Sequence, residues 1–257
     1  MNPSKGLILG GGLSIRQGLW NLPVTDLPIW RKIQNEFVIG TNFSNLFFPS
    51  TVLMYSDYHF YHTQKQWLDK VPLIVGRDDD YYRRDQCIGL GDNVTLLKGS
   101  TKYNGINSLK EGLYTFQLVG MAAISFAIGL GCKEIYLLGF DACEINGHTH
   151  FYDDIAIGTY FYNKQKYCGI GKHKTTEGQY IYNTGNYNKI KELNEHWFKP
   201  FEKALVDGIK IYNVSLESKI NTFQKISMEQ MFHNIEQSPS QYSQDEIRKE
   251  IKCQLSQ

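Results

Sequence analysis

The sequence has 257 residues, of which 42% are hydrophobic and 14% aromatic, and its 27 basic and 26 acidic residues leave a net charge of +1. This composition suffices for a sizeable core in one large domain or two small ones. The balanced charge gives no sign of the broad basic surface that is typical of a protein that binds nucleic acid or an anionic membrane. No apolar run reaches the roughly 20 residues that a membrane span requires.

The five cysteines, at positions 87, 132, 143, 168 and 253, are scattered along the chain. None forms a C-x-x-C pair, so neither a zinc site nor a disulfide framework is predicted. The amino-terminal residues run directly into an apolar, strand-like segment and lack the cleavage pattern of a signal peptide. We therefore expect a cytoplasmic protein with reduced thiols.

Short, continuous apolar runs predict strands that are buried on both faces of a sheet. They cover residues 6–9, 37–40, 51–55, 72–75 and 94–97. The first run ends at Gly10, Gly11 and Gly12. Because Ser14 and Gln17 have the spacing of a capping box, we predict a strand, a glycine turn and a short helix.

The clearest unit lies between residues 116 and 141. A helix is predicted over 116–130, where small residues indicate close packing, and Gly131 is placed to end it. A strand over 134–139 follows and leads to Asp141. A helix, a glycine, a strand and an aspartate form half of a βαβ unit, which predicts an α/β fold with a mostly parallel sheet flanked by helices.

The remaining segments have weaker patterns. Pro23 and Pro28 indicate a loop, and helices are predicted over 58–70 and 188–205, before a last strand over 209–213. Residues 146–186 have no clear period, and a long segment of this kind is typical of a functional loop, so we predict a lid or insertion.

The carboxyl-terminal tail from residue 236 is polar. Ser243 and Glu246 cap a small helix there, which carries Ile247, Ile251 and Leu255 on one face. This helix either docks on the body or meets a partner. We thus predict one domain over residues 1–235, including the insertion, followed by a tail over residues 236–257.

The glycine turn is the first candidate site. Gly10, Gly11 and Gly12 allow close approach of the backbone, and a helix that begins at Ser14 would offer N–H groups to a phosphate. A plain strand-to-helix turn fits the same residues. The turn is neither a G-x-G-x-x-G motif, because Ile15 occupies the third glycine position, nor a P-loop, because no G-K-[ST] follows.

Polar residues after three predicted strands form the second candidate site. Asn42, Asp57 and Asp141 each follow a strand, and ligands of open α/β sheets bind at the carboxyl ends of the strands. Asp141 could accept a hydrogen bond from a ribose hydroxyl or hold a metal ion. Each residue alone also fits a turn or a helix cap, but three of them favour a ligand site.

The predicted insertion contains the third candidate site. His148, His150, Asp153 and Asp154 could hold a metal ion or supply a general acid or base. Basic side chains in the same segment could neutralise phosphate charge; they are Lys164, Lys166, Lys172, His173 and Lys174. A solvated basic loop is the alternative interpretation.

Two segments resemble a known superfamily. Residues 7–14 read L-I-L-G-G-G-L-S, and residues 119–141 read V-G-M-A-A-I-S-F-A-I-G-L-G-C-K-E-I-Y-L-L-G-F-D. They resemble the G-x-G-P-S-L opening and the S-G-x-x-A-x-x-x-A-x-x-L-G-x-K-x-I-x-L-x-G-x-D segment of Rossmann-like transferases, which include archaeal-type 6-hydroxymethylpterin diphosphokinases and bacterial lipooligosaccharide sialyltransferases. Residues 39–42 and 208–215 resemble the strand-to-Asn element and closing strand of the same superfamily, and residues 150–153 resemble a patch in phage-borne relatives.

The resemblance implies a Rossmann-like fold with residues 10–14 and Gly120 near the nucleotide phosphates and Asn42 near the reacting centre. The chain departs from the superfamily at Val119, where a Ser or Thr is usual, and it has no clear counterpart of the sialyltransferase histidine. His150 or His173 would then take the role of the base.

These observations together predict a nucleotide-dependent transferase, namely a glycosyltransferase that moves a sugar from a nucleotide-sugar to a glycan or small-molecule acceptor and requires no cofactor. Asp141 would orient the ribose or the acceptor, and His150 would accept the proton of the acceptor. One alternative is ATP-dependent diphosphate transfer to a pterin-like alcohol, with Mg²⁺ on Asp57, Asp141 or Asp153. Another is a non-catalytic nucleotide-binding or virion-associated protein whose carboxyl-terminal helix docks on a partner.

Overall fold

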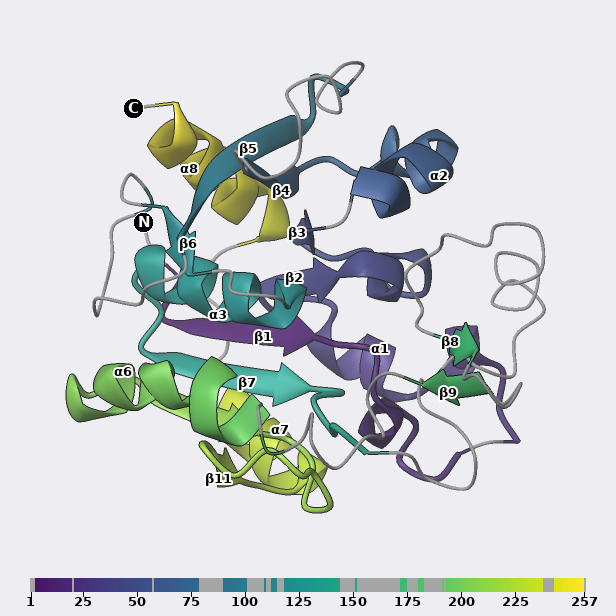
Figure 1. The fold of residues 1–257 in the computed structure, drawn as a ribbon, viewed down its shortest axis with the longest axis vertical. Helices are drawn as coiled ribbons and strands as arrows, with labels where there is room; N and C mark the ends of the chain where they lie inside the picture. Colours follow the sequence, from purple (N-terminus) through teal and green to yellow (C-terminus); the bar gives the residue numbers. More distant parts are fainter. Residues whose placement is uncertain are drawn as a thin grey trace.

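The computed structural model describes residues 3–19, 21–56, 58–78, 90–100, 109, 112–114, 118–143, 151, 172–174, 180–182, 191, 193–237 and 243–256. These residues form a Rossmann-like α/β fold around a nine-stranded parallel sheet with the strand order β11-β10-β7-β1-β2-β3-β4-β5-β6 (Figure 1). The strands are β1 Lys5–Leu9, β2 Val38–Thr41, β3 Val52–Tyr55, β4 Ile74–Asp78, β5 Val94–Ser100, β6 Leu113–Tyr114, β7 Glu134–Leu138, β10 Lys210–Asn213 and β11 Gln224–Lys225. The predicted α/β class is therefore confirmed.

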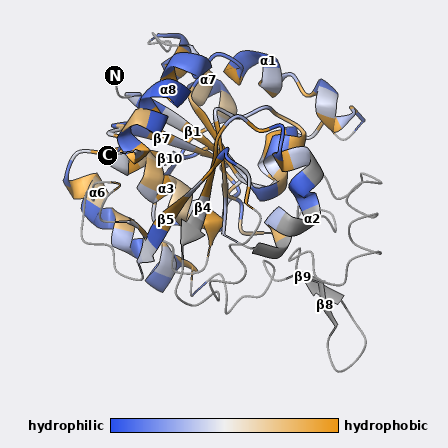
Figure 2. Cartoon of the chain, turned by 90° about the horizontal axis from the view of Figure 1, so that it is seen from above, coloured by the Kyte–Doolittle hydropathy of each residue, from blue (hydrophilic) through white to orange (hydrophobic). Residues whose placement is uncertain are grey.

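The central strands β1, β2, β3 and β7 are mainly apolar and buried because both faces of the sheet are covered there. In β1, Ile8 packs into the core cluster that contains α3 (Val119–Gly129), whereas Leu7 and Leu9 pack into a second cluster with α1 (Ile29–Ile33) and α7 (Met228–Glu236). Alternate residues of a strand point to opposite faces, so a strand covered on both sides needs an unbroken apolar run. Figure 2 shows the hydrophobic strands at the centre and hydrophilic residues on the outer helices.

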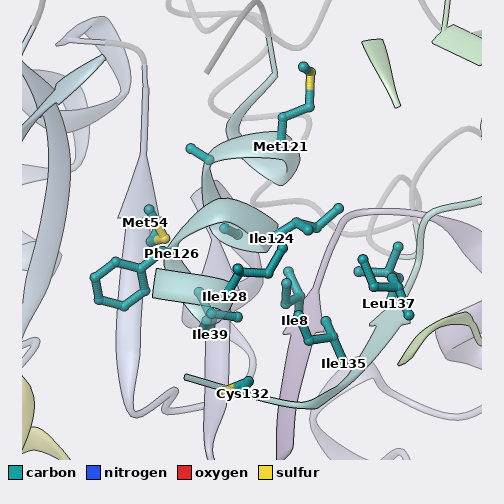
Figure 3. Packing of buried hydrophobic residues seen from close by; sticks show 14 of the residues in the cluster. Ile8, Ile39, Met54, Met121, Ile124, Phe126, Ile128, Cys132, Ile135 and Leu137 are labelled. Atoms are coloured by element: carbon teal, nitrogen blue, oxygen red, sulfur yellow. The ribbon is translucent and has the colours of Figure 1, made fainter. Parts of the chain in front are cut away.

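Helix α3 is apolar all round because it is buried. Figure 3 shows its Ile124 and Ile128 packed close to Ile8, Ile39 and Ile135 of the sheet. A helix without a polar face is typical of a buried core element. Within the described residues, no helix combines the length and the apolar composition that crossing a membrane would require.

The sheet reverses its direction of growth beside β1. The chain passes from β1 through β2, β3, β4 and β5 to β6 on one side, and then α3 leads back to β7, which pairs with the opposite edge of β1. The connections that follow β1 and β7 therefore lead in opposite directions along the strand order. This topological switch point is where open α/β sheets bind their ligands.

The predicted long helix over 188–205 is wrong in its described part. The chain forms a π-turn over Leu193–Trp197, a 3-10 turn over Lys199–Phe201 and then the short helix α6, Glu202–Val206. Pro200 lacks an N–H and its ring would clash within a continuous α-helix. The amide of Phe198 instead donates to the Leu193 carbonyl oxygen at 2.9 Å, the i to i+5 spacing of a π-turn.

The region after Pro23 is more structured than predicted. It contains a 3-10 turn over Val24–Asp26 and then α1, in front of which Pro28 stands. A proline is compatible with the start of a helix because the first N–H groups have no partner within the helix. The predicted helix over 58–70 is observed as α2, Tyr58–Leu68.

The carboxyl-terminal helix docks on the body of the protein. Helix α8 spans Gln244–Leu255 and begins with the predicted capping box of Ser243 and Glu246. Ile247 and Ile251 are buried in the same core cluster as α3, and Arg248 Nε donates to the Thr51 carbonyl oxygen at 2.9 Å. The apolar face of α8 is thus covered by the chain itself.

Of the predicted insertion over 146–186, the structure describes Phe151 and two short strands. Strands β8 (Lys172–Lys174) and β9 (Tyr180–Tyr182) form an antiparallel pair that is separate from the main sheet. The predicted roles of Lys172 and His173, which lie in β8, stay predictions.

Candidate functional site

A cavity of about 240 Å³ lies at the carboxyl ends of β7, β1 and β2, at the topological switch point. Six residues proposed from the sequence line it together: Gly10, Gly11, Gly12, Asn42, Gly120 and Asp141. They come from four segments that are far apart in the chain and that the parallel sheet brings to one edge. Asp57, His148, His150 and Asp153 lie outside the described residues, and their predicted roles remain predictions.

The glycine turn is joined to the segment after β7 by hydrogen bonds. The amides of Gly10 and Gly12 donate to the carbonyl oxygens of Leu138 and Gly139 at 2.7 and 2.8 Å. A Cβ atom on Gly12 would lie 2.5 Å from Asp141 Oδ2 and 2.7 Å from the Gly139 carbonyl oxygen. Glycine is therefore required here so that the two loops can approach each other.

The predicted role of the turn in phosphate binding needs two corrections. Ser14 does not cap a helix: it lies inside a 3-10 turn over Leu13–Arg16, and Gln17 ends that turn in a left-handed conformation. The Ser14 amide donates to Asp141 Oδ2 at 2.7 Å. The amides of Gly10, Gly12 and Ser14 are thus already used within the protein, and a four-residue turn has little dipole to offer an anion.

Asp141 is the most deeply buried acidic group of the cavity, with 2% of its surface exposed. Its Oδ2 accepts the Ser14 amide, whereas its buried Oδ1 has no hydrogen-bond partner among the described residues. Leaving a buried acceptor without a partner costs about 1–3 kcal/mol, and the cost is higher for a charged group. This unsatisfied acceptor belongs to a residue that lines the cavity.

Asn42 presents a second buried acceptor from the end of β2. The hydroxyl of Thr41 donates to the Leu9 carbonyl oxygen at 2.7 Å, and the Thr41 amide donates to Ser44 Oγ at 2.8 Å. The first bond fixes the end of β2 against β1, and the second caps the 3-10 turn that follows β2. Asn42 follows with a φ of 48°, and its buried Oδ1 has no partner among the described residues. Asparagine tolerates this left-handed conformation better than most residues.

The segment after β7 is strained next to Asp141. Ala142 has a φ of 51° and lines the cavity. Unlike glycine, alanine is disfavoured in the left-handed region by about 1–2 kcal/mol. Strain of this kind persists where the surrounding structure holds it and is concentrated at functional sites.

The start of α3 supplies a positive dipole end to the cavity. Leu118, Val119 and Gly120 line the cavity, and the N-cap residue Leu118 has no side chain that caps the helix. A Cβ atom on Gly120 would lie 2.6 Å from the Phe140 ring, so glycine lets the helix start pack against the loop after β7. The amino end of an eleven-residue helix attracts anions such as phosphate.

Comparison of the chain with family models, curated proteins and solved structures finds no match.

One part of the cavity lining is an apolar wall that the sequence did not predict. Leu193, Phe198 and Ile220 form it, from the π-turn and from the connection after β10. Asn194 joins these two segments: its Nδ2 donates to the Lys219 carbonyl oxygen at 2.8 Å and its Oδ1 accepts the Asn221 amide at 2.6 Å. A wall of this kind suits a flat, apolar ring, but the apolar periodicity of residues 188–205 predicted a regular helix and did not bring these residues together with Ile220.

Cys143 also lines the cavity and is half-buried. Burial raises the pKa of its thiol, and the negative charge of Asp141 raises the pKa further. The thiol is therefore mainly neutral near pH 7, whereas a catalytic cysteine needs a lowered pKa. Among the described residues, no group of three or more His, Cys, Asp or Glu side chains is placed to hold a metal ion.

A buried arginine attaches Phe151 to the glycine turn. Arg16 Nε donates to the Phe151 carbonyl oxygen at 2.7 Å, and the Phe151 amide donates to the Gly11 carbonyl oxygen at 2.9 Å. The Phe151 ring packs edge-on against Trp30 and Phe47, with ring centroids 6.1 and 5.5 Å apart. Phe151, which directly follows the predicted base in the sequence, is thus held beside a cavity-lining residue.

Proposed function

We propose that the chain is a nucleotide-dependent transferase, namely a glycosyltransferase whose cavity holds the nucleotide part of a nucleotide-sugar. One observation carries the proposal: within the part of the chain that the structure describes, the buried Oδ1 atoms of Asp141 and Asn42 both lack hydrogen-bond partners, and both residues line one cavity at the switch point of a parallel sheet. We expect acceptors of this kind to pair with a ligand that donates hydrogen bonds, such as the hydroxyl groups of a ribose.

Three kinds of surface in the cavity match the three parts of a nucleotide. The acceptors of Asp141 and Asn42 suit sugar hydroxyls, and the start of α3 suits a phosphate group. The apolar wall of Leu193, Phe198 and Ile220 suits a flat base. A site with an apolar lining and a few convergent polar groups is typical of small-molecule binding.

The transferase part of the proposal is supported by the resemblance of residues 119–141 to the Rossmann-like transferases. In the proposed reaction, the oxygen of the acceptor hydroxyl attacks the anomeric carbon of the donor sugar. The bond between that carbon and the phosphate oxygen breaks, and the nucleotide leaves with the electron pair. The start of α3 would stabilise the charge that develops on the phosphate, and His150, the residue before the anchored Phe151, would accept the acceptor proton.

A thermal-shift screen tests this function with CMP-, UDP- and GDP-sugars, free nucleotides and ATP, each with and without Mg²⁺. A ligand at a hundredfold excess over its dissociation constant stabilises the folded state by about 2.7 kcal/mol, which raises the melting temperature. We expect a nucleotide-sugar to raise it without added metal. Asp141→Asn should weaken this binding at least tenfold. With the oxygen of the new side chain paired to the Ser14 amide, its NH₂ group would face the hydroxyl groups of the ligand, where the wild type offers an acceptor.

Asp245→Asn is the matched control for this screen. Asp245 lies in the first turn of α8, with 91% of its side chain exposed, at the opposite edge of the sheet. This variant should keep the full ligand shift. A shift with ATP only in the presence of Mg²⁺ would instead favour diphosphate transfer, in which Asp141 Oδ1 would be a metal ligand. No shift with any compound of the panel would contradict the proposed function.

A further inference from the structure

Two buried polar residues behind the cavity hold the backbone that carries Asp141. Asn213, at the end of β10, has 0% of its surface exposed, and Ser218 has 1%. The Ser218 hydroxyl donates to the Phe140 carbonyl oxygen at 2.7 Å, and Asn213 Nδ2 donates to the same oxygen at 3.0 Å. Both lone pairs of the carbonyl that precedes Asp141 are therefore occupied.

The hydroxyl group of Ser218 uses its full hydrogen-bonding capacity. It donates to the Phe140 carbonyl oxygen, and it accepts Asn213 Nδ2 at 2.9 Å and the Ile220 amide at 3.0 Å. A serine hydroxyl has one donor and two acceptor positions. The Oδ1 of the neighbouring Asn213 has no partner among the described residues, so the restraint on the chain comes from the bonds of Ser218 and of Asn213 Nδ2.

The same segment also holds Asp141 itself. The Lys219 amide donates to the Asp141 carbonyl oxygen at 2.8 Å. On either side of the two restrained carbonyl groups lie the left-handed residues Gly139, with a φ of 71°, and Ala142, with a φ of 51°. A strained backbone persists only where its surroundings determine it, and here the residues after β10 supply that restraint.

We infer that Asn213 and Ser218 are positioning residues for Asp141: they set the backbone so that Oδ2 meets the Ser14 amide and Oδ1 is left for the ligand. This inference rests on the proposed function for the role of Oδ1. Neither residue lines the cavity, and both contact the Phe140 carbonyl oxygen, so we expect them to act on the ligand mainly through the segment that carries Asp141. The adjacent Ile220 amide connects the network to the apolar wall of the cavity.

The hydrogen bond from the Ser14 amide to Asp141 Oδ2 reports this positioning without any ligand. We expect Ser218→Ala to accelerate hydrogen exchange of the Ser14 amide, measured by NMR, at least tenfold relative to the wild type. Asn213→Ala should act in the same direction, and it provides a second measurement if Ser218→Ala gives too little folded protein.

Ser227→Ala is the matched control, because Ser227 caps α7 by accepting the Gln230 amide and takes no part in the cavity. Loss of this cap lowers the free energy of unfolding but leaves the contacts of the Asp141 segment in place. The exchange rate of the Ser14 amide should therefore rise only by the amount that the lower global stability explains. If Ser218→Ala and Asn213→Ala exchange no faster than Ser227→Ala, the inference is wrong.

A second measurement separates this inference from the proposed function. UDP and 3′-deoxy-UDP are compared as probes for each variant by calorimetry. We expect Ser218→Ala to bind UDP at least tenfold more weakly. The ratio of the UDP affinity to the 3′-deoxy-UDP affinity should also fall in this variant, whereas Ser227→Ala should keep the wild-type affinity and the wild-type ratio. Unchanged affinity and preference in Ser218→Ala would overturn the inference. If the wild type binds neither UDP nor any nucleotide of the screen, the proposed function fails, and exchange of the Ser14 amide alone decides the positioning role.

Discussion

The edge of the sheet where the strands begin (the amino edge) and the edge where they end (the carboxyl edge) differ in the hydrogen bonding of their buried polar groups. At the amino edge, Gln244 and Arg248 of α8 donate to the carbonyl oxygens of Gln34 and Thr51, each at 2.9 Å, and the capping box of Ser243 satisfies the start of the helix. At the carboxyl edge, by contrast, the Oδ1 atoms of Asn42 and Asp141 are buried without a partner among the described residues, and Asn42 and Ala142 have left-handed backbones.

This difference separates a structural edge from a functional one. Buried polar groups of folded proteins are nearly always hydrogen-bonded, and departures from local rules are expected at functional or strained sites. The amino edge follows those rules, because the side chains of α8 supply donors to the chain. The carboxyl edge breaks them at the topological switch point, which is the reason to expect a ligand there.

The strongest test of the carboxyl edge is Gly12→Ala. The new Cβ atom would lie 2.5 Å from Asp141 Oδ2, so the glycine turn and the loop after β7 would have to separate. Overpacking of this kind typically lowers stability by about 1–3 kcal/mol, and we expect a loss of about 2–3 kcal/mol in the free energy of unfolding in urea. The variant should also lose nucleotide binding, because Asp141 moves.

Gly208→Ala is the control for this effect. Gly208 has a φ of 85° but no atom within 4 Å of its would-be Cβ, so the substitution introduces backbone strain without a clash. We expect a loss of about 1 kcal/mol and unchanged ligand binding. Equal losses for the two variants would show that the close contact between the loops is not important.

At the amino edge, Ser243→Ala should have a medium effect. Ser243 accepts the Glu246 amide, and its own amide and hydroxyl donate to Glu246 Oε2 at 2.8 Å. Loss of an N-cap typically destabilises by about 1 kcal/mol. Thermal unfolding should therefore shift downwards, with nucleotide binding unchanged, whereas Ser256→Ala at the exposed end of α8 should have little effect.

The same cap gives this edge a pH dependence. The backbone amide and the hydroxyl of Ser243 lower the pKa of Glu246 in the folded state. A carboxyl group with a lowered pKa contributes stability above its unfolded pKa and loses it as the pH falls through the folded pKa. The difference between wild type and Ser243→Ala should thus shrink below about pH 4. A difference that stays constant from pH 7 to pH 3 would contradict the role of Glu246.

The sequence predicted the sheet well because its signals are local. Unbroken apolar runs indicated strands covered on both faces, and the positions of Asn42 and Asp141 after strands placed them at one edge. The glycine turn illustrates the limit of this reasoning. Its glycines line the cavity, as predicted. The spacing of residues does not tell, however, whether their N–H groups donate to a phosphate or, as here, to carbonyl groups at the end of β7 and just after it.

Other parts of the site had no local signal at all. Asn213 and Ser218 reach Phe140 over 73 and 78 residues of sequence, and such pairing depends on β10 lying beside β7. The apolar wall depends on a π-turn that replaces a predicted helix, because Pro200 interrupts the apolar periodicity that suggested one. Long-range contacts and a broken helix are features of the tertiary structure, so the pattern of residues did not reveal them.

The smallest expected effect tests whether the strain at the carboxyl edge is real. Ala142→Gly should relieve about 1–2 kcal/mol of left-handed strain and lose about 0.5–1 kcal/mol through the greater freedom of glycine in the unfolded chain. We expect a net gain of about 0.5 kcal/mol in urea unfolding. In contrast, Ala204→Gly, a buried position in α6, should lose about 1 kcal/mol. If Ala142→Gly loses as much stability as Ala204→Gly, position 142 is unstrained. If Ala142→Gly instead gains stability but binds the nucleotide more weakly, the strained backbone serves to hold Asp141 in position for the ligand.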